Sequence, residues 1–238
     1  MLVDQDLCIG CGECVPYCPV GAISMQGDLA VIDFDECVEC ANCQRCAPCP
    51  TEAFVQQELV WPRVIRSIMS NVLVVAPNTG IPGRGTEEMK TNDVTGRFKR
   101  GWLGVGIEMG RPIVGARFRD VQKVAMAVAE LGVEFEAMNP VTAVMADPRT
   151  GKMNPEILDE KVYSAIIEFA IPEDKFPDLM TIVERVSEEV DTVFSLEISA
   201  RCLPGGDLAT TPLLEKYGCW AAPNGKTCLG LGKPPAKE

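Results

Sequence analysis

Nine of the twelve cysteines of this chain lie in one stretch near its start, in two runs of similar spacing. The first run has the pattern C-x2-C-x2-C-x3-C-P and contains Cys8, Cys11, Cys14 and Cys18, followed by Pro19. Thiolates two residues apart on a curled loop can each bind a different iron of a [4Fe-4S] cubane, and this spacing is typical of such clusters. The second run is an imperfect repeat, with Cys37, Cys40, Cys43, Cys46 and Cys49, followed by Pro50. The two runs predict two [4Fe-4S] clusters.

The two runs belong to an internal duplication. Each proline is followed by a similar tetrapeptide, Val20 to Ile23 in the first half and Thr51 to Phe54 in the second, and we expect a hairpin between the halves. With these motifs, residues 1–60 resemble a two-[4Fe-4S] bacterial-type ferredoxin domain, in which the fourth cysteine of each run reaches across to the other cluster. The resemblance implies that Cys8, Cys11, Cys14 and Cys49 hold one cluster, and that Cys18, Cys37, Cys40 and Cys43 hold the other.

The second run departs from the family pattern because an additional cysteine, Cys46, stands between Cys43 and Cys49. The third ligand of this run could be Cys43 or Cys46. An ungapped match of the second run to the first favours Cys43. Structural zinc is a weaker reading, since zinc sites usually pair cysteines in two separated C-x2-C knuckles. A disulfide framework is weaker still, because nothing in the chain marks it as secreted.

The length, the N-terminus and the composition of the chain limit where it can work and which chemistry it can carry out. The 238 residues are enough for one or two domains with a proper core. The N-terminus lacks the features of a signal peptide, and no apolar run approaches the roughly 20 residues that span a bilayer. With oxygen-labile clusters, this predicts the cytoplasm of an organism that lives with little oxygen. The chain contains no histidine, so it lacks the usual general base of enzymes and the usual zinc ligand.

The net charge of −12 is unevenly distributed. Residues 1–60 carry ten acidic side chains and one basic one, Arg45, whereas residues 61–100 carry seven basic and three acidic side chains. An acidic surface around redox clusters can steer docking onto a basic patch of a redox partner, and it disfavours nucleic acid. Solubility alone is an equally good explanation of the acidic charge.

The segment 61–100 is expected to be a basic, glycine-rich connector. It includes an apolar run, residues 71–77, that predicts a buried strand. The polar loop that follows is either a solvated loop or a binding loop. As a binding loop it would form an anion pocket, with backbone amides exposed by glycines and with the cationic side chains of Arg84, Lys90 and Arg97.

Residues 101–200 alternate between strand and helix patterns. We expect strands over 103–109, 112–118, 135–145, 162–171 and 192–199, and helices over 121–131 and 179–189. This order predicts a ferredoxin-like split βαβ fold, an α/β sandwich with both helices on one face of an antiparallel sheet. The module resembles ACT-like ligand-sensing or subunit-pairing domains, which implies that two copies of the chain could associate through it. The predicted fold class of the whole chain is α+β.

The tail, residues 201–238, is expected to be loop-like, and it holds the last three cysteines. Once eight ligands are assigned to two clusters, the cysteines that remain are Cys46, Cys202, Cys219 and Cys228. Four is the number that a third [4Fe-4S] cluster needs, and three would leave an open iron for a substrate or partner. Free or partly buried thiols are the alternative, which the scattered spacing favours.

A second resemblance concerns the segment from Gly83 to Arg97, behind a two-cluster ferredoxin domain. This arrangement is similar to the iron-sulfur part of 6-hydroxynicotinate reductase-like proteins, and nothing here resembles a flavin-binding portion. The sequence therefore favours an electron-transfer component of an oxidoreductase complex over a complete enzyme. The alternatives are a reductase of a small, carboxylated, unsaturated substrate and a redox- or ligand-sensing binding protein.

Overall fold

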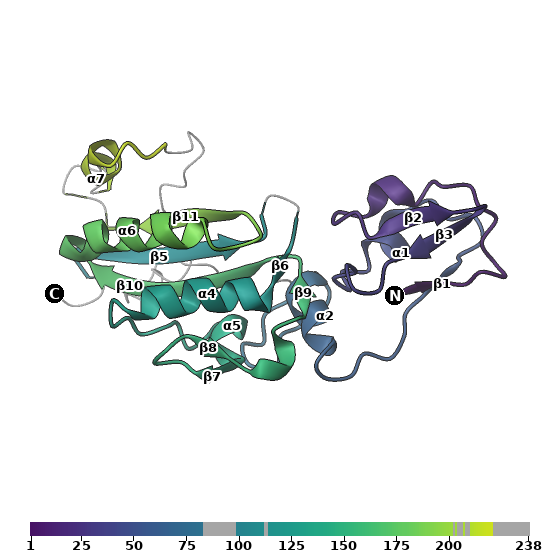
Figure 1. Cartoon of the computed structure of the whole chain (residues 1–238), viewed down its shortest axis with the longest axis horizontal. Coiled ribbons are helices and arrows are strands. Elements are labelled where there is room, and N and C mark those ends of the chain that lie inside the picture. The colour runs from purple at the N-terminus through teal and green to yellow at the C-terminus, as the bar shows by residue number, and fades with distance from the viewer. Residues whose placement is uncertain (83–98, 112–113, 202, 204–206, 208–209, 221–238) are drawn as a thin grey trace.

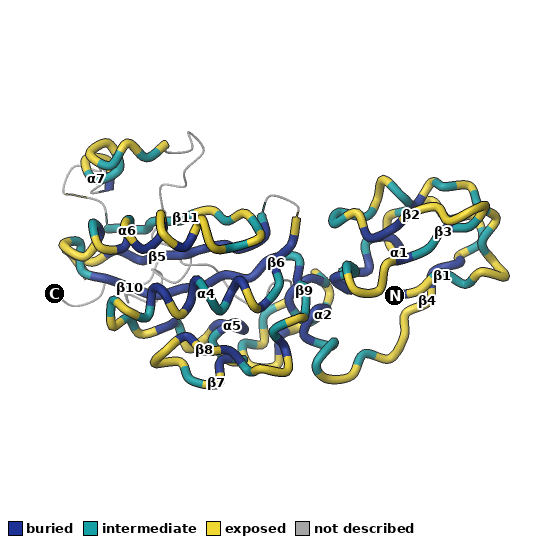
Figure 2. The backbone as a smooth tube through the Cα atoms, in the orientation of Figure 1, coloured by how far each residue is buried: buried dark blue, intermediate teal, exposed yellow. Residues whose placement is uncertain are grey.

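The fold consists of two domains joined end to end, as the computed structural model shows (Figure 1). The structure describes residues 1–82, 99–111, 114–201, 203, 207 and 210–220. The N-terminal domain contains the cysteine runs, and the C-terminal module is formed by helix α2 (Val64–Ser70) together with the elements from β5 (Trp102–Met109) to β11 (Phe194–Ser199). Each domain has its own cluster of buried apolar side chains, and the strands β5 and β10 form the most deeply buried part of the module (Figure 2).

The N-terminal domain is small and built from two similar halves. The expected hairpin is present as β2 (Ile23–Gln26) and β3 (Leu29–Ile32), which pair in antiparallel register. Strands β1 (Leu2–Val3) and β4 (Phe54–Val55) pair across the ends of the domain. Two short helices carry cysteines or their neighbours, the 3-10 helix at Val15–Tyr17 and α1 (Asn42–Cys46).

The connector 61–100 contains a helix, α2 (Val64–Ser70), which packs into the core of the C-terminal module through Ile65 and Met69. The predicted strand over 71–77 is wrong. Within the described residues this run forms only an isolated bridge, between Val75 and Pro82, and Leu73 is 71% exposed. An apolar run becomes a strand only when a neighbouring strand satisfies its backbone groups, and among the residues that the structure describes this run has only that one bridge.

The sheet of the C-terminal module has the order β10-β5-β11, and both pairings are antiparallel. Its strands are β5 (Trp102–Met109), β10 (Ala165–Pro172) and β11 (Phe194–Ser199), which confirms three of the predicted strands. Ile107 lies opposite Ile167 on one side and Leu196 on the other, so alternate apolar residues share one face. That face forms the module's core.

The long helices α4 (Phe118–Ala129) and α6 (Phe176–Ser187) lie side by side against the sheet (Figure 1). Each helix buries an apolar stripe with helical spacing, made of Val121, Val124, Ala125 and Val128 in α4 and Leu179, Ile182, Val183 and Val186 in α6. This spacing is why the sequence predicts both helices, although α4 begins at Phe118, earlier than expected.

The predicted strand over 135–145 is wrong, and it is reduced to a bridge between Phe135 and Phe169 of β10. Asn139 and Pro140 explain the difference. The Asn139 side chain accepts a hydrogen bond from the Val141 backbone amide at 2.7 Å, and Pro140 occupies the first turn of the short helix α5 (Pro140–Ala143). An asparagine cap followed by proline starts a helix, so the strand ends before it can form.

Short strands complete the module. β6 (Ala116–Arg117) pairs with β9 (Lys161–Val162), and β7 (Met145–Asp147) pairs with β8 (Lys152–Met153). The strand expected over 112–118 is thus only two residues long in its described part, because Phe118 already begins α4. Single 3-10 turns lie at Pro155–Ile157 and Glu173–Lys175.

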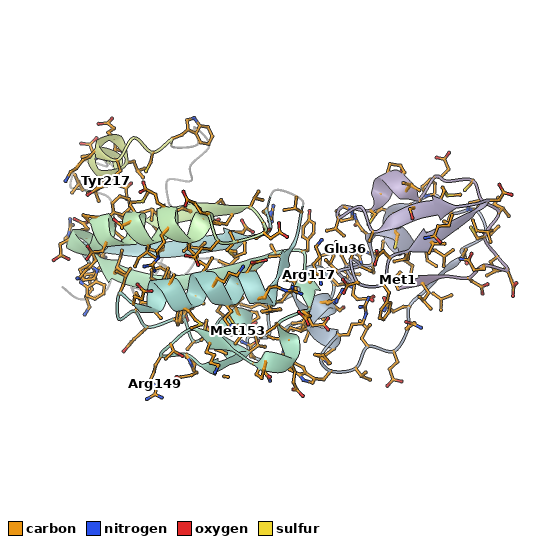
Figure 3. All side chains as sticks on the ribbon, in the orientation of Figure 1. Met1, Glu36, Arg117, Arg149, Met153 and Tyr217 are labelled. Carbon is orange, nitrogen blue, oxygen red and sulfur yellow. The ribbon has the colours of Figure 1, made fainter. Side chains whose placement is uncertain are left out.

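The tail was expected to be loop-like, but its described part contains a helix, α7 (Thr211–Lys216). Tyr217, which follows it, packs edge-on against Phe176 of α6 with ring centroids 5.4 Å apart. This contact attaches α7 to the end of the module that lies away from the N-terminal domain (Figures 1 and 3). Among the described residues, the helices are too short or too polar to cross a membrane.

Candidate metal centres

The N-terminal domain contains two cavities lined by cysteines from both runs. One cavity is lined by Cys8, Cys11, Cys14 and Cys49, and the other by Cys18, Cys37, Cys40 and Cys43. The two cavities are equally small, about 20 Å³ each. The structure thus brings together the same two groups of cysteines that the resemblance implies, each with three members from one run and one from the other.

The loops around the cavities owe their shape to left-handed backbone conformations. In the first run Gly10 and Gly12 have φ of +70° and +73°, and a Cβ at Gly10 would lie 2.0 Å from the carbonyl oxygen of Asp28. The equivalent positions in the second run are Glu39 and Ala41, both with φ of 55°. A residue with a side chain is strained there. Only glycine fits the crowded first loop, whereas the second must be stabilised by other contacts.

The side chain of Glu39 supplies such contacts. It is fully buried, and its carboxylate lies 2.7 Å from the amino group of Met1 and 2.6 Å from Arg63 Nη2. Gln56 donates a further hydrogen bond at 3.2 Å. Buried charges persist only when they are paired in this way. The ion pairs therefore fix the backbone between Cys37 and Cys40.

Backbone amides point at two of the sulfurs in equivalent ways. Ala22 N–H donates to Cys18 Sγ at 3.1 Å, and Ala53 N–H donates to Cys49 Sγ at 3.4 Å. Each donor lies four residues after its cysteine, beyond the proline of its run. Such donors stabilise thiolates and shift the potential of iron-sulfur clusters. Four cysteines with an apolar lining surround each cavity, and this donor set fits a [4Fe-4S] cubane.

A family model described as "4Fe-4S binding domain" matches residues 1–24. The "Ferredoxin-like protein in vnf region" of Azotobacter chroococcum mcd 1 is 44% identical over 59 residues, which are 24% of this chain and 91% of the relative. The chain belongs to the ferredoxin family. The "Ferredoxin" of Chlorobaculum thiosulfatiphilum is 45% identical over 53 residues, which are 21% of this chain and 87% of that relative. "Ferredoxin-2" of Desulfomicrobium norvegicum is 55% identical over 31 residues, 13% of this chain and 52% of that relative.

The N-terminal domain is accordingly a ferredoxin-like iron-sulfur electron carrier domain, and ferredoxin-like carriers act with redox partners. Bound iron-sulfur clusters supply one-electron transfer. The protein itself supplies the cysteine ligands, the apolar side chains that surround them and the charged groups nearby. Within the described residues no three ligand side chains approach closely enough for a single metal ion, whereas a cubane spreads its thiolates over four irons.

Burial acts strongly on the cysteines of the ferredoxin domain. It raises the pKa of Cys43 to about 12, and the neighbouring thiols of Cys37 and Cys40 act in the same direction. Burial also raises the pKa of Cys14, Cys37 and Cys40. Cys49 differs, because hydrogen bonds from Ala53 and Thr51 outweigh its burial and lower its pKa. Ligation by metal must therefore displace protons from most of these thiols.

Cys46 lies outside both cavities of the ferredoxin domain. It is exposed at the end of α1, and its sulfur lies 3.6 Å from the side-chain oxygen of Asn42. Cys43, one turn earlier, is buried beside Cys37 and Cys40. Of the two candidates for the third ligand of the second run, the structure brings only Cys43 to the other cysteines.

The four remaining cysteines are not gathered in one place. Cys46 belongs to α1 of the ferredoxin domain, whereas Cys219 follows α7 at the opposite end of the molecule (Figure 1). The distance between these two elements does not favour a single cubane held by all four cysteines, and a third cluster stays an untested prediction. Cys202 and Cys228 lie outside the described residues, and so do the predicted anion contacts Arg84, Lys90 and Arg97.

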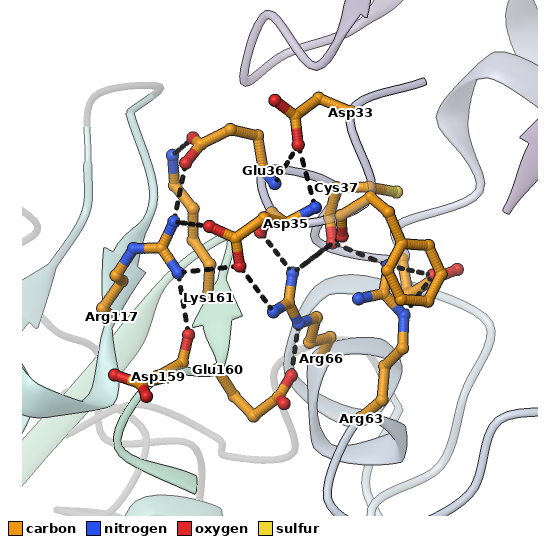
Figure 4. Close-up of polar contacts among 12 residues, drawn as sticks. Asp33, Asp35, Glu36, Cys37, Arg63, Arg66, Arg117, Asp159, Glu160 and Lys161 are labelled. Carbon is orange, nitrogen blue, oxygen red and sulfur yellow. Dashed lines mark hydrogen bonds and ion pairs between the residues drawn. The ribbon is translucent and has the colours of Figure 1, made fainter. Parts of the chain in front are cut away.

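An ionic junction between the two domains was not predicted from the sequence (Figures 3 and 4). Asp35 and Glu36, which precede Cys37, both accept hydrogen bonds from Arg117 Nη2 at 2.7 Å, and Glu36 also pairs with Lys161. These partners hold the pKa of Asp35 and Glu36 below the ordinary values, mainly through hydrogen bonds from Arg117 and Lys161 respectively. Part of the acidic surface expected to meet a partner's basic patch is thus paired within the chain.

Arg66 of α2 completes the junction (Figure 4). It is buried, pairs with Glu160, and donates to the carbonyl oxygens of Asp35 at 2.6 Å and Cys37 at 2.9 Å. A sequence signal existed, since the basic excess of 61–100 was visible. The partners, however, are separated by up to 125 residues, so only the folded chain shows the pairing.

Proposed function

We propose that this protein is an iron-sulfur electron-transfer subunit that passes low-potential electrons to or from a larger anaerobic oxidoreductase in the cytoplasm. The observation that supports this most directly is the pair of cavities, each lined by four cysteines drawn from both runs. We assign one [4Fe-4S] cluster to each, with Cys8, Cys11, Cys14 and Cys49 as ligands of the first and Cys18, Cys37, Cys40 and Cys43 as ligands of the second.

In this proposal the ferredoxin domain, residues 1–60, carries the electrons, and the rest of the chain docks onto the oxidoreductase. The strand order β10-β5-β11, the bridge beside β10 and the two helices on one face support a split βαβ, ACT-like module over residues 101–200. Residues 61–100 connect the domains, with α2 belonging to the module, and 201–238 form the tail. Pairing of two copies through the module is part of the proposal.

The test is the iron and acid-labile sulfide content of anaerobically purified protein. We expect about eight irons per chain in the natural protein and about four in either a Cys11→Ser or a Cys40→Ser variant. A triple variant, Cys202→Ser with Cys219→Ser and Cys228→Ser, is expected to keep about eight. About twelve irons in the natural protein, falling to about eight in the triple variant, would instead establish a third cluster in the C-terminal part.

Turnover distinguishes a subunit from a complete reductase. The segment containing Arg84 and Arg97, which resembles 6-hydroxynicotinate reductase-like proteins, would have to bind a carboxylated, unsaturated substrate in the second case. We expect the purified chain with an artificial reductant to be inactive until a partner is added. Substrate reduction by the single chain would overturn the subunit proposal and support the reductase.

A sensing function is the second candidate, and one observation favours it. A cavity of about 710 Å³ opens along the edge of β10 and is lined by both apolar and polar side chains, among them Trp102, Phe135, Glu136, Phe169 and Lys175. Clefts of this size suit a small molecule. A ligand that shifts the cluster potentials without being turned over would identify a sensor.

A further inference from the structure

The two proposed clusters of this ferredoxin domain lie in different electrostatic surroundings. Near the second set of cysteines, three guanidinium groups donate to ligand carbonyls (Figure 4 shows two of them). Arg45 Nη2 donates to the Cys40 carbonyl at 2.8 Å, while Arg66 Nη1 and Arg63 Nη2 donate to the Cys37 carbonyl at 2.9 and 3.5 Å. Positive charge is therefore placed directly behind two of the four proposed ligands.

Carboxylates near the second set are paired with cations. Glu39 pairs with Arg63 and the Met1 amino group, Asp35 pairs with Arg66 and Arg117, and Glu36 pairs with Arg117 and Lys161. Five basic side chains and the Met1 amino group face five acidic side chains here, namely Arg45, Arg63, Arg66, Arg117 and Lys161 against Asp33, Asp35, Glu36, Glu39 and Glu160. The local charge near Cys37 is thus close to balanced.

The first set lacks this compensation. Residues 1–44 contain no lysine or arginine. Acidic side chains lie close to the first set in the sequence, namely Asp4, Asp6, Glu13 and Glu52. The hydrogen bonds that Arg45, Arg63 and Arg66 donate to cysteine carbonyls go to Cys37 and Cys40, which belong to the second set. An electron added here meets a negative field.

Adding an electron adds one negative charge, which nearby cations stabilise and nearby carboxylates oppose. Because Arg63 and Arg66 are largely buried, solvent and salt screen their effect only partly. We propose that the cluster held by Cys18, Cys37, Cys40 and Cys43 has the higher reduction potential of the two. The electron then rests beside α2 and the C-terminal module. This inference depends on the proposed function, since it requires both clusters.

The test is a potentiometric titration of the complete protein, followed by the electron paramagnetic resonance of the reduced clusters. We expect two separate reduction waves, one for each cluster. Arg45→Gln removes an exposed charge beside Cys40 and is expected to shift the upper wave to lower potential while the lower wave stays in place. Arg45→Lys keeps the charge, so the upper wave should stay close to its potential in the natural protein. Arg185→Gln removes an exposed charge from the distant helix α6 and should move neither wave.

Arg66→Gln should have a larger effect on the potential. It can also destabilise the fold, because it leaves Glu160 without this partner. If it folds with full iron content, the upper wave should fall further than in Arg45→Gln. A single wave in the natural protein, or an Arg45→Gln shift of the lower wave, would overturn the inference and leave the proposed function intact at about eight irons per chain. Far fewer irons would overturn both.

Discussion

At the residue scale, the two halves of the ferredoxin domain reach the same backbone shape by different means. Gly10 adopts a left-handed conformation at no cost, whereas its counterpart Glu39 is held there by buried ion pairs. Glu52 likewise has φ of 52° where the first half has Gly21 at +67°. The duplication therefore conserves geometry more closely than residue type.

Gly10 is expected to be irreplaceable. In Gly10→Ala the new methyl group would meet the Asp28 carbonyl, which lies 2.0 Å from an ideal Cβ, so the loop carrying Cys8 and Cys11 must move. We expect about four of eight irons to be lost. Gly27→Ala is the matched control, because Gly27 also has positive φ but has open space around it. It should cost only about 1–2 kcal/mol and keep its iron. Equal iron loss in both would show that backbone strain, rather than the close contact, is responsible.

The choice between Cys43 and Cys46 can be tested directly. Cys43 lines a cavity with three other cysteines, and Cys46 is exposed. We expect Cys43→Ala to reduce the iron content from about eight to about four per chain, and Cys46→Ala to leave it unchanged. Iron analysis of both variants decides the question, and a loss confined to Cys46→Ala would reverse the assignment.

At the scale of elements, helix α2 makes contacts in both domains. It lies between the two domains, contributes Ile65 and Met69 to the core of the module, and carries Arg66 toward the loop before Cys37. Strands β6 and β9 contribute Arg117 and Lys161 to the same junction. Three elements of the module thus hold one loop of the ferredoxin domain.

Neighbouring arginines test the junction. Arg117 forms ion pairs with Asp35 and Glu36, whereas Arg119 forms its ion pair with Asp159 of the module and exerts only a weaker attraction on Asp35. Because these pairs are partly exposed, we expect Arg117→Ala to weaken the association between the ferredoxin domain and the C-terminal module by about 1 kcal/mol. This is roughly a fivefold change in the equilibrium between associated and separated domains. Arg119→Ala should have little effect. Small-angle X-ray scattering should show a larger radius of gyration for Arg117→Ala, most clearly at high salt. Identical scattering of both variants would count against the junction.

At the scale of the whole molecule, the chain has two separate cores. The core of the ferredoxin domain is formed around the cysteines by Met1, Ile23, Ile32 and Phe54, and the module's core is larger and combines aliphatic with phenylalanine side chains. The contacts that join the domains are chiefly ionic. Such a junction lets each domain keep its own stability.

Two isoleucine variants should separate the domains. Ile107 in the middle of β5 is fully buried, so Ile107→Ala should lower the free energy of unfolding of the module by about 2–5 kcal/mol and leave the iron content unchanged. Ile23 lines the second cysteine cavity, so Ile23→Ala should reduce cluster retention and leave the module's transition in place. Circular dichroism and iron analysis measure the two effects. Loss of iron in Ile107→Ala would show that the domains fold as one unit.

Local patterns in the sequence predicted much of the fold. Helical spacing of Val121 to Val128 was enough for α4, and strict alternation was enough for β5 and β11, because these periodicities depend only on neighbours along the chain. The same reasoning failed for 71–77, whose described strand pairing amounts to one isolated bridge at Val75, and for 135–145, where Asn139 and Pro140 start a helix.

The sequence by itself determined the chemistry of this protein, because the cysteines of a cluster are largely spaced along one short run and their pattern is readable without a structure. Only the tertiary structure decided what surrounds that chemistry. It buried Cys43 rather than Cys46, and it brought Arg117 and Lys161 to Glu36 across 81 and 125 residues. Charge pairing depends on distance in space, and no local pattern in the chain records that distance.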